Sequence, residues 1–144
     1  MEDEIVDDEI GKLEKEIIYR GYTGYIRQYR NSWDQWRGIF VIIPKGNKLY
    51  EVDYDDLDLD IPREITYSED GFVFGEYIPD NEIKTLKNSD WVLGIEFIDK
   101  KEKDLKGVEE ELKSLIDEVI KAGAWWMIRL KDKKWYLQIQ KVIQ

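Results

Sequence analysis

Arginine and aromatic side chains are concentrated between residues 20 and 37. The segment RGYTGYIRQYRNSWDQWR contains four of the six arginines of the chain, interleaved with three tyrosines and two tryptophans. Guanidinium groups bind phosphate through paired hydrogen bonds, and aromatic rings stack on nucleobases. The segment therefore predicts a site for a small nucleotide, formed by Arg20, Arg27, Arg30, Trp33, Trp36 and Arg37. Packing of the rings across neighbouring strands, with the arginines paired to acidic residues, explains the same pattern without a ligand.

A second concentration of chemistry is the acidic segment EVDYDDLDLD at residues 51–60. It holds six carboxylates and no basic residue: Glu51, Asp53, Asp55, Asp56, Asp58 and Asp60. Along an extended strand, alternate carboxylates lie roughly 6–7 Å apart, so such a row imitates the phosphates of a nucleic acid and fits a basic groove. We therefore expect these six residues to bind a partner protein with a basic surface. A solvated sheet edge that resists aggregation is the simpler alternative.

Metal binding and catalysis are not expected. The acidic segment lacks the glycine and the terminal glutamate of a calcium-binding loop. The chain contains no histidine and no cysteine, which removes the commonest general base and the commonest metal ligands. It also contains no P-loop, no dinucleotide-binding glycine pattern and no G-x-S-x-G elbow. The sequence therefore predicts no catalytic residues, no metal site and no cofactor, and it does not favour an enzyme.

The formal net charge is −10, and the acidity lies in two segments. Residues 1–16 hold eight acids and two lysines, and residues 51–60 hold six acids, so each segment carries −6 and the other 118 residues sum to +2. A net negative charge repels nucleic acid at long range, so direct nucleic-acid binding is not expected. A local basic patch still attracts a small anion, because charges are screened beyond roughly 8–10 Å at physiological salt.

One amphipathic helix is expected at residues 107–122. Six apolar residues recur there at helical spacing: Val108, Leu112, Leu115, Ile116, Val119 and Ile120. This spacing places them on one face, which must be buried against other elements. Alternating or continuous apolar residues at 17–29, 37–43 and 91–98 predict strands. Together these segments predict an α+β fold in which an antiparallel or mixed sheet packs against one helix.

The remaining elements are shorter. The acidic N-terminal segment, residues 1–16, shows helix-like apolar spacing and predicts a short helix, whereas residues 51–60 fit either an edge strand or a loop. The Asp-Gly turn at residues 68–71 predicts a hairpin between 65–67 and 72–74. Clean alternation at 125–143 predicts a C-terminal β-hairpin. We expect a single domain over 1–144, with the sheet at 17–98. The sequence does not decide between a monomer and an oligomer.

Four stretches of the chain carry a resemblance to a known family. Residues 36–50 read WRGIFVIIPKGNKLY, residues 54–57 read YDDL, residues 61–68 read IPREITYS and residues 91–99 read WVLGIEFID. This resembles a family of small, mostly uncharacterised proteins of bacteriophages and mobile elements, with the patterns W-x-G-Y-V-x-I-P-x-G-H-x-L-Y, Y-D-D-L, V-H-G-G-I-T-Y-S and W-x-x-G-F-D-x-x-H. The three histidines of the family are Asn47, Pro62 and Asp99 here, and its paired glycines are Arg63 and Glu64. A histidine-dependent role therefore does not carry over.

The resemblance implies a viral or mobile-element accessory protein, a class in which many small proteins counter host defences by binding. We therefore expect an inhibitor of a host defence factor, comparable in kind to anti-CRISPR proteins, that binds its target directly through the acidic surface. The alternative is capture of a small nucleotide signal by the arginine and aromatic segment. No stretch approaches the roughly 18 apolar residues of a membrane span, and the N-terminus is acidic. We therefore expect no membrane partner and a location in the cytoplasm of an infected or carrier host cell.

Overall fold

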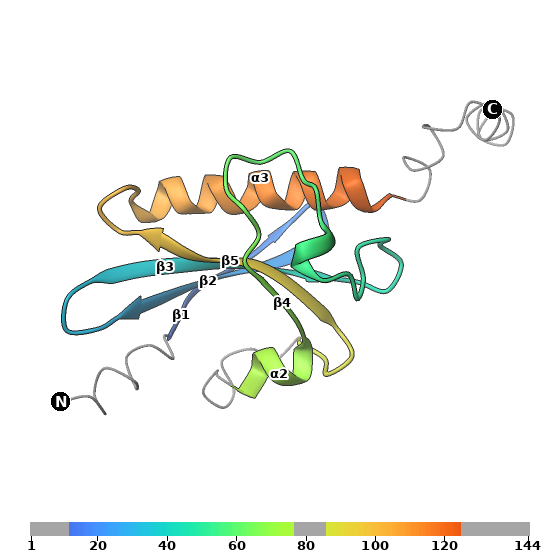
Figure 1. Cartoon of the computed structure of the whole chain (residues 1–144), viewed down its shortest axis with the longest axis horizontal. Coiled ribbons are helices and arrows are strands. Elements are labelled where there is room, and N and C mark those ends of the chain that lie inside the picture. The colour runs from blue at the N-terminus through green and yellow to red at the C-terminus, as the bar shows by residue number, and fades with distance from the viewer. Residues whose placement is uncertain (1–11, 77–85, 125–144) are drawn as a thin grey trace, which may run out of the picture.

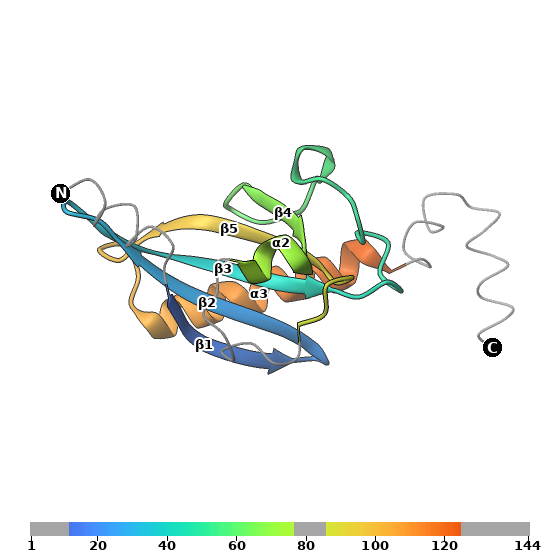
Figure 2. The ribbon, with the colours of Figure 1, turned by 90° about the horizontal axis from the view of Figure 1, so that it is seen from below.

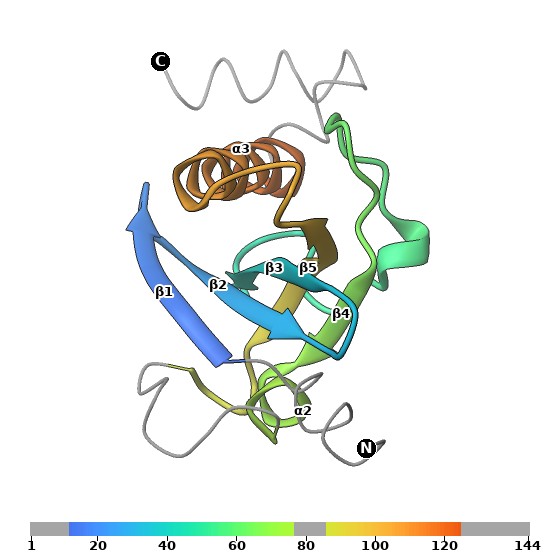
Figure 3. The ribbon, with the colours of Figure 1, turned by 90° about the vertical axis from the view of Figure 1, so that its left-hand side faces the viewer.

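The computed structural model describes residues 12–76 and 86–124. They form a five-stranded sheet with strand order β1-β2-β3-β5-β4, in which every neighbouring pair is antiparallel. A long helix, α3, lies across one face, and a short helix, α2, lies on the other (Figures 1 and 3). The elements are β1 (Lys12–Tyr19), β2 (Tyr22–Arg30), β3 (Gln35–Ile43), the 3-10 turn η1 (Tyr54–Asp56), β4 (Tyr67–Asp70), α2 (Gly71–Glu76), β5 (Trp91–Asp99) and α3 (Leu105–Gly123). The α+β architecture expected from the sequence is confirmed.

Helix α3 provides the main core. It begins after Asp104, whose carboxylate caps it by accepting a hydrogen bond from the backbone N–H of Gly107 at 2.8 Å. Five of the six apolar residues expected on its inner face are at most 1% exposed: Val108, Leu112, Leu115, Ile116 and Val119. They pack against apolar side chains of β2, β3 and β5, among them Ile26, Val41 and Leu93. The helix expected at 107–122 is therefore present, extended by two residues at its start and one at its end.

The N-terminal part of the sheet differs from the expectation. A helix over 1–16 is wrong where the structure describes it, because residues 12–16 belong to β1, and 17–29 is not one strand but parts of β1 and β2. Between them Arg20 and Gly21 have positive φ angles of 52° and 82°, as a two-residue hairpin turn requires. Residues 12–19 pair with β2 along their whole length. This pairing outweighs the helix-like spacing of the apolar residues, of which only about one turn lies within the described residues.

The hairpin expected around residues 68–71 is also wrong. Residues 67–70 form β4, which pairs with β5, and the chain turns into α2 at Gly71. The Asp70 carboxylate accepts a hydrogen bond from the backbone N–H of Val73 at 2.8 Å, so this aspartate starts a helix instead of a β-turn. Gly71 is required because a Cβ there would lie 1.9 Å from the carbonyl oxygen of Lys87.

The face opposite α3 is aromatic. Phe74 of α2 is 1% exposed and contacts Tyr25 and Phe40 of the sheet, with ring centroids 6.1 and 5.1 Å apart. The ring of Phe40 lies over Gly94, where a Cβ would come within 2.3 Å of it. Figure 2 shows α2 against the middle of this face. The sheet therefore has two hydrophobic layers, and only one of them was expected from the sequence.

A β-bulge in β5 extends this aromatic layer. Arg37 pairs with Ile98 and Ile39 pairs with Ile95, so two residues of β5, Glu96 and Phe97, oppose Gly38 of β3. The extra residue changes the side-chain alternation. As a result the ring of Phe97 stacks on Trp36 at 5.1 Å while Ile98 stays in the helix-facing core.

Two expected elements fall wholly or partly outside the described residues. These are the C-terminal hairpin at 125–143 and the first eleven residues of the N-terminal segment. Within 12–76 and 86–124, no helix combines the length and the apolar character needed to cross a membrane.

Replacing Leu112 by alanine should lower the free energy of unfolding by about 2–5 kcal/mol, because the side chain is fully buried and contacts β2 at Gly24. Urea denaturation followed by circular dichroism measures this. The exposed Ser114 on the same helix serves as the control, and Ser114→Ala should change the stability by less than about 0.5 kcal/mol. Equal stability of the two variants would contradict the packing described for α3.

Candidate functional site

The acidic segment is a loop that connects β3 to β4. Its middle forms η1, and its six acidic residues, Glu51, Asp53, Asp55, Asp56, Asp58 and Asp60, are all exposed. Between them, Leu57 and Leu59 are half-buried and pack against the helix-facing core. The edge-strand interpretation is therefore wrong and the loop interpretation is confirmed. Because η1 interrupts the extended backbone, the carboxylates do not form the evenly spaced row of a strand.

Hydrogen bonds to the sheet and to α3 hold this acidic loop, residues 51–60, in place. The indole Nε1 of Trp91 donates to the carbonyl of Val52 at 3.1 Å, and the backbone N–H of Tyr54 donates to Ser68 Oγ at 3.1 Å. Just before the loop, the backbone N–H of Lys48 donates to the carbonyl of Gly123 at 2.7 Å. The loop is thereby joined to β5 and β4, and the turn just before it is joined to the end of α3.

The turn before the loop depends on a buried amide. Asn47 is 5% exposed, and its Nδ2 donates to the hydroxyl of Tyr22 at 3.0 Å and to the carbonyl of Val119 at 3.2 Å. Its Oδ1 accepts a hydrogen bond from the backbone N–H of Leu49 at 2.8 Å. Asn47 therefore joins β2, the turn and α3.

Grooves lie on both sides of the acidic loop. A groove of about 460 Å³ lies between the loop and the C-terminal end of α3. Its lining includes apolar residues and charges of both signs: Leu49, Leu57, Leu59, Asp56, Asp58, Asp60, Glu118, Lys48 and Lys121. A second groove of about 400 Å³ lies between the loop and residues 61–65. The loop therefore projects as a ridge, and a partner can contact it from two sides.

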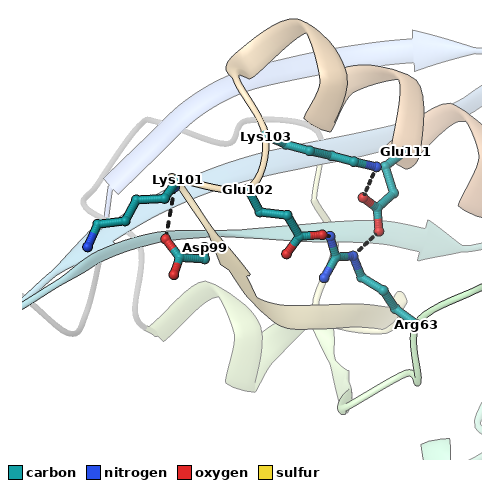
Figure 4. A network of polar contacts seen from close by, with 6 residues as sticks. All are labelled: Arg63, Asp99, Lys101, Glu102, Lys103 and Glu111. Carbon is teal, nitrogen blue, oxygen red and sulfur yellow. Dashed lines mark hydrogen bonds and ion pairs between the residues drawn. The ribbon is translucent and has the colours of Figure 1, made fainter.

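An ion-pair network fastens the chain where the acidic loop ends (Figure 4). The guanidinium group of Arg63 lies between the carboxylates of Glu102 and Glu111, and the ammonium group of Lys103 donates to Glu111 at 2.8 Å. Burial would raise the pKa of Glu111, but the hydrogen bonds and positive charges of Lys103 and Arg63 outweigh it and hold the pKa below its ordinary value. The network joins the loop exit to the first turns of α3.

The carboxylates of the acidic loop are not engaged in ion pairs within the described structure, although Lys48 and Lys121 line one of the adjoining grooves. Among the described residues, no ion pair involves any of its six carboxylates. Asp53 precedes η1, yet its side chain makes no capping hydrogen bond. Because the carboxylates have no structural task in the described contacts, the loop presents a charge of −6 to the solvent.

Arg20, Arg27 and Arg37 of the nucleotide hypothesis have identified contacts within the fold. Arg20 pairs with Asp117 of α3 at 2.8 Å. Arg37 makes a bidentate pair with Glu14 of β1, at 2.8 Å from Nε and 3.1 Å from a terminal nitrogen. Arg27 is 4% exposed and lies over the rings of Tyr29 and Phe74, at 5.3 and 5.7 Å from their centroids.

The six residues of that hypothesis do not converge on one site. Arg20 precedes β2 and Arg30 ends it, so the nine residues of β2 separate them by roughly 30 Å. Trp36 is stacked between Tyr29 and Phe97, whereas Trp33 is 80% exposed in the turn after β2. Lys100 and Lys101, which the sequence did not suggest for any site, line a groove together with Trp33. The contact between these lysines and the turn has no signal in the sequence.

Comparisons with protein-family models, with curated proteins and with solved structures find no match to this chain. The resemblance to phage and mobile-element proteins therefore stays a prediction. In the part of the chain that the structure describes, no group of three acidic residues is placed so that it could hold a metal ion.

Replacing Arg63 by glutamine should lower the free energy of unfolding at pH 7 by about 1.5–3 kcal/mol, because Glu111 loses a charged hydrogen-bond donor. The folded-state pKa of Glu111 lies below its ordinary value of 4.5, so this contribution is present above that pH and is lost as the pH falls through the folded-state pKa. Urea denaturation at pH 7 and pH 3 should therefore show a smaller difference between wild type and Arg63→Gln at the lower pH. A difference that is the same at both pH values would contradict this role of the pair.

Proposed function

We propose that this protein acts by binding, and that the acidic loop is the surface it presents to a partner protein with a basic surface. The observation that carries the proposal is the exposure of all six carboxylates on a segment that hydrogen bonds join to β4 and β5. A charged loop that only improved solubility would not need hydrogen bonds to two strands. The sequence resemblance supports the setting: an accessory protein of a phage or mobile element that blocks a host defence factor.

Electrostatics favours this use of the loop. A compact charge of −6 attracts a basic surface over a distance of about one Debye length and raises the association rate, typically by 10- to 1000-fold. Because the loop is held by hydrogen bonds and by the buried parts of Leu57 and Leu59, little conformational entropy is lost when a partner binds. The carboxylates are irregularly spaced around η1. This spacing fits the uneven distribution of positive charge on a general protein surface better than a groove that binds the regularly spaced phosphates of a nucleic acid.

Removing charge from the loop tests the proposal. The variant with Asp53, Asp55, Asp56 and Asp58 all replaced by asparagine keeps the side-chain size and removes four charges. Proteins retained from a bacterial host lysate by the immobilised wild type are identified by mass spectrometry, and the binding of each purified protein is then measured by surface plasmon resonance. For a true partner, the variant should associate at least about tenfold more slowly, and wild-type association should slow as salt rises. A partner bound equally by the variant at low salt would contradict the proposal.

A matched pair of variants separates the loop from the net charge of the protein. Asp56→Asn with Asp58→Asn should weaken partner binding, whereas Glu76→Gln with Glu110→Gln removes the same charge from exposed residues outside the loop and should not. Equal losses in the two double variants would show that only the total charge matters. Melting temperatures of the variants should stay within a few degrees of wild type, because all four residues are exposed.

A further inference from the structure

The turn between β2 and β3 carries an exposed tryptophan that the acidic loop does not explain. Trp33 is 80% exposed, although tryptophan is the largest side chain and gains most from burial. The turn lies at the opposite end of β3 from the acidic loop (Figures 1 and 2). A binding role for this turn would therefore not depend on the function proposed for the acidic loop.

The turn holds Trp33 in a defined position. Asn31 Oδ1 accepts hydrogen bonds from the backbone N–H groups of Trp33 and Asp34, at 2.9 and 2.8 Å. The backbone N–H of Asn31 donates in turn to the carbonyl of Asp34 at 3.0 Å. Because the backbone of the turn is already fixed, stacking of a planar ligand costs only the side-chain freedom of the ring.

Lysines from the connection between β5 and α3 complete the site. A groove of about 360 Å³, within the usual range for small-molecule sites, is formed by Trp33, Lys100 and Lys101 with the neighbouring residues of the turn. The ammonium group of Lys100 donates to the amide oxygens of Gln28 and Gln35, each at 3.2 Å. An ammonium group has three N–H donors, so one donor stays available for an anion.

The groove contains one carboxylate, that of Asp34, and two lysines, and the neighbouring carboxylates of Asp99 and Glu102 have other partners. Asp99 accepts a hydrogen bond from the backbone N–H of Lys101, while the side chain of Lys101 extends away from it (Figure 4). Glu102 faces Arg63, and Asp34 accepts a hydrogen bond from the backbone N–H of Gln35. Within the described residues, neither Lys100 nor Lys101 forms an ion pair with a carboxylate.

We propose that this groove, the tryptophan-lysine site, binds a nucleoside phosphate. The base stacks on the indole of Trp33, and the phosphate accepts hydrogen bonds from the ammonium groups of Lys100 and Lys101. A small anion responds to these local charges, because the distant carboxylates are screened beyond roughly 8–10 Å. A nucleic-acid polymer would extend over the acidic surface of a protein of charge −10, so the ligand is a mononucleotide.

Nuclear magnetic resonance titration of the full chain with adenosine 5′-monophosphate tests the site. We expect saturable shifts of one indole N–H signal, absent from Trp33→Phe, and of backbone amides in 31–35 and 100–101. Adenosine and inorganic phosphate, which each offer half of the ligand, should bind at least about tenfold more weakly. No saturable shift at millimolar nucleotide, or shifts confined to other residues, would overturn the proposal. Equal shifts with a tetraglutamate peptide would reassign the site to acidic peptides and overturn it too.

Substitutions distinguish stacking and specific charge from general attraction. Trp33→Ala should weaken nucleotide binding by about tenfold without changing the melting temperature, since the ring is exposed. Lys100→Gln and Lys101→Gln should each weaken it by a similar factor. Lys48→Gln and Lys121→Gln remove the same charge at the opposite end and should have no effect. Equal losses from both pairs would mean only long-range attraction and would overturn the site. The fourfold asparagine variant of the acidic loop should bind the nucleotide as wild type does.

Discussion

Five apolar side chains of α3 lie buried against one face of the sheet, and both ends of this helix hold the connections that flank it. At the C-terminal end, the carbonyl of Gly123 accepts the N–H of Lys48, and a Cβ at Gly123 would come within 1.9 Å of the Asn47 side chain. At the N-terminal end, Glu111 pairs with Arg63, just after the acidic loop. Burial of the helix therefore positions the loop from two directions. The extensive apolar contact of α3 with the sheet stabilises the fold, whereas the directional polar contacts at its ends fix the positions of the adjoining connections.

Charge is distributed so that the two ends of the molecule differ. Arg20 and Arg37, which the sequence suggested for ligand binding, neutralise acidic residues of α3 and β1. The acidic loop has no such partners among the described residues and faces solvent at one end of the sheet. At the other end, the closed turn displays Trp33 next to two lysines. A protein of net charge −10 thus combines an acidic loop without ion pairs among the described residues with a small groove lined by Trp33, two lysines and Asp34.

The second face of the sheet shows how a small change in backbone register reorganises side chains. The bulge at Glu96 and Phe97 brings Phe97 onto Trp36, and Trp36 in turn stacks on Tyr29 at 5.8 Å. Ring pairs of this kind stabilise a sheet by about 0.5–1.5 kcal/mol beyond their buried area. Two aromatic residues in the segment 20–37 are therefore used for cross-strand packing, which was the alternative to the nucleotide hypothesis. The space for Phe40 depends on the missing side chain of Gly94.

Periodicity and composition determined the α+β class, the helix around 107–122, the strands at 37–43 and 91–98 and the exposure of the acidic residues, because each depends on local apolar spacing or on the hydration of charge. Two features could not be predicted: the hairpin turn at Arg20 and Gly21, and the start of α2 at Asp70. The same residue types fit a bulge or a β-turn, and only pairing with distant strands decides between these structures. The sequence likewise did not determine which groups the charged side chains contact within the fold. Whether Arg37 meets Glu14 or a phosphate, and whether Lys100 meets Trp33, depends on strand order, which brings together residues that the chain separates by 23 and 67 positions. Such contacts arise from tertiary structure alone, because no local pattern records which strand lies beside which.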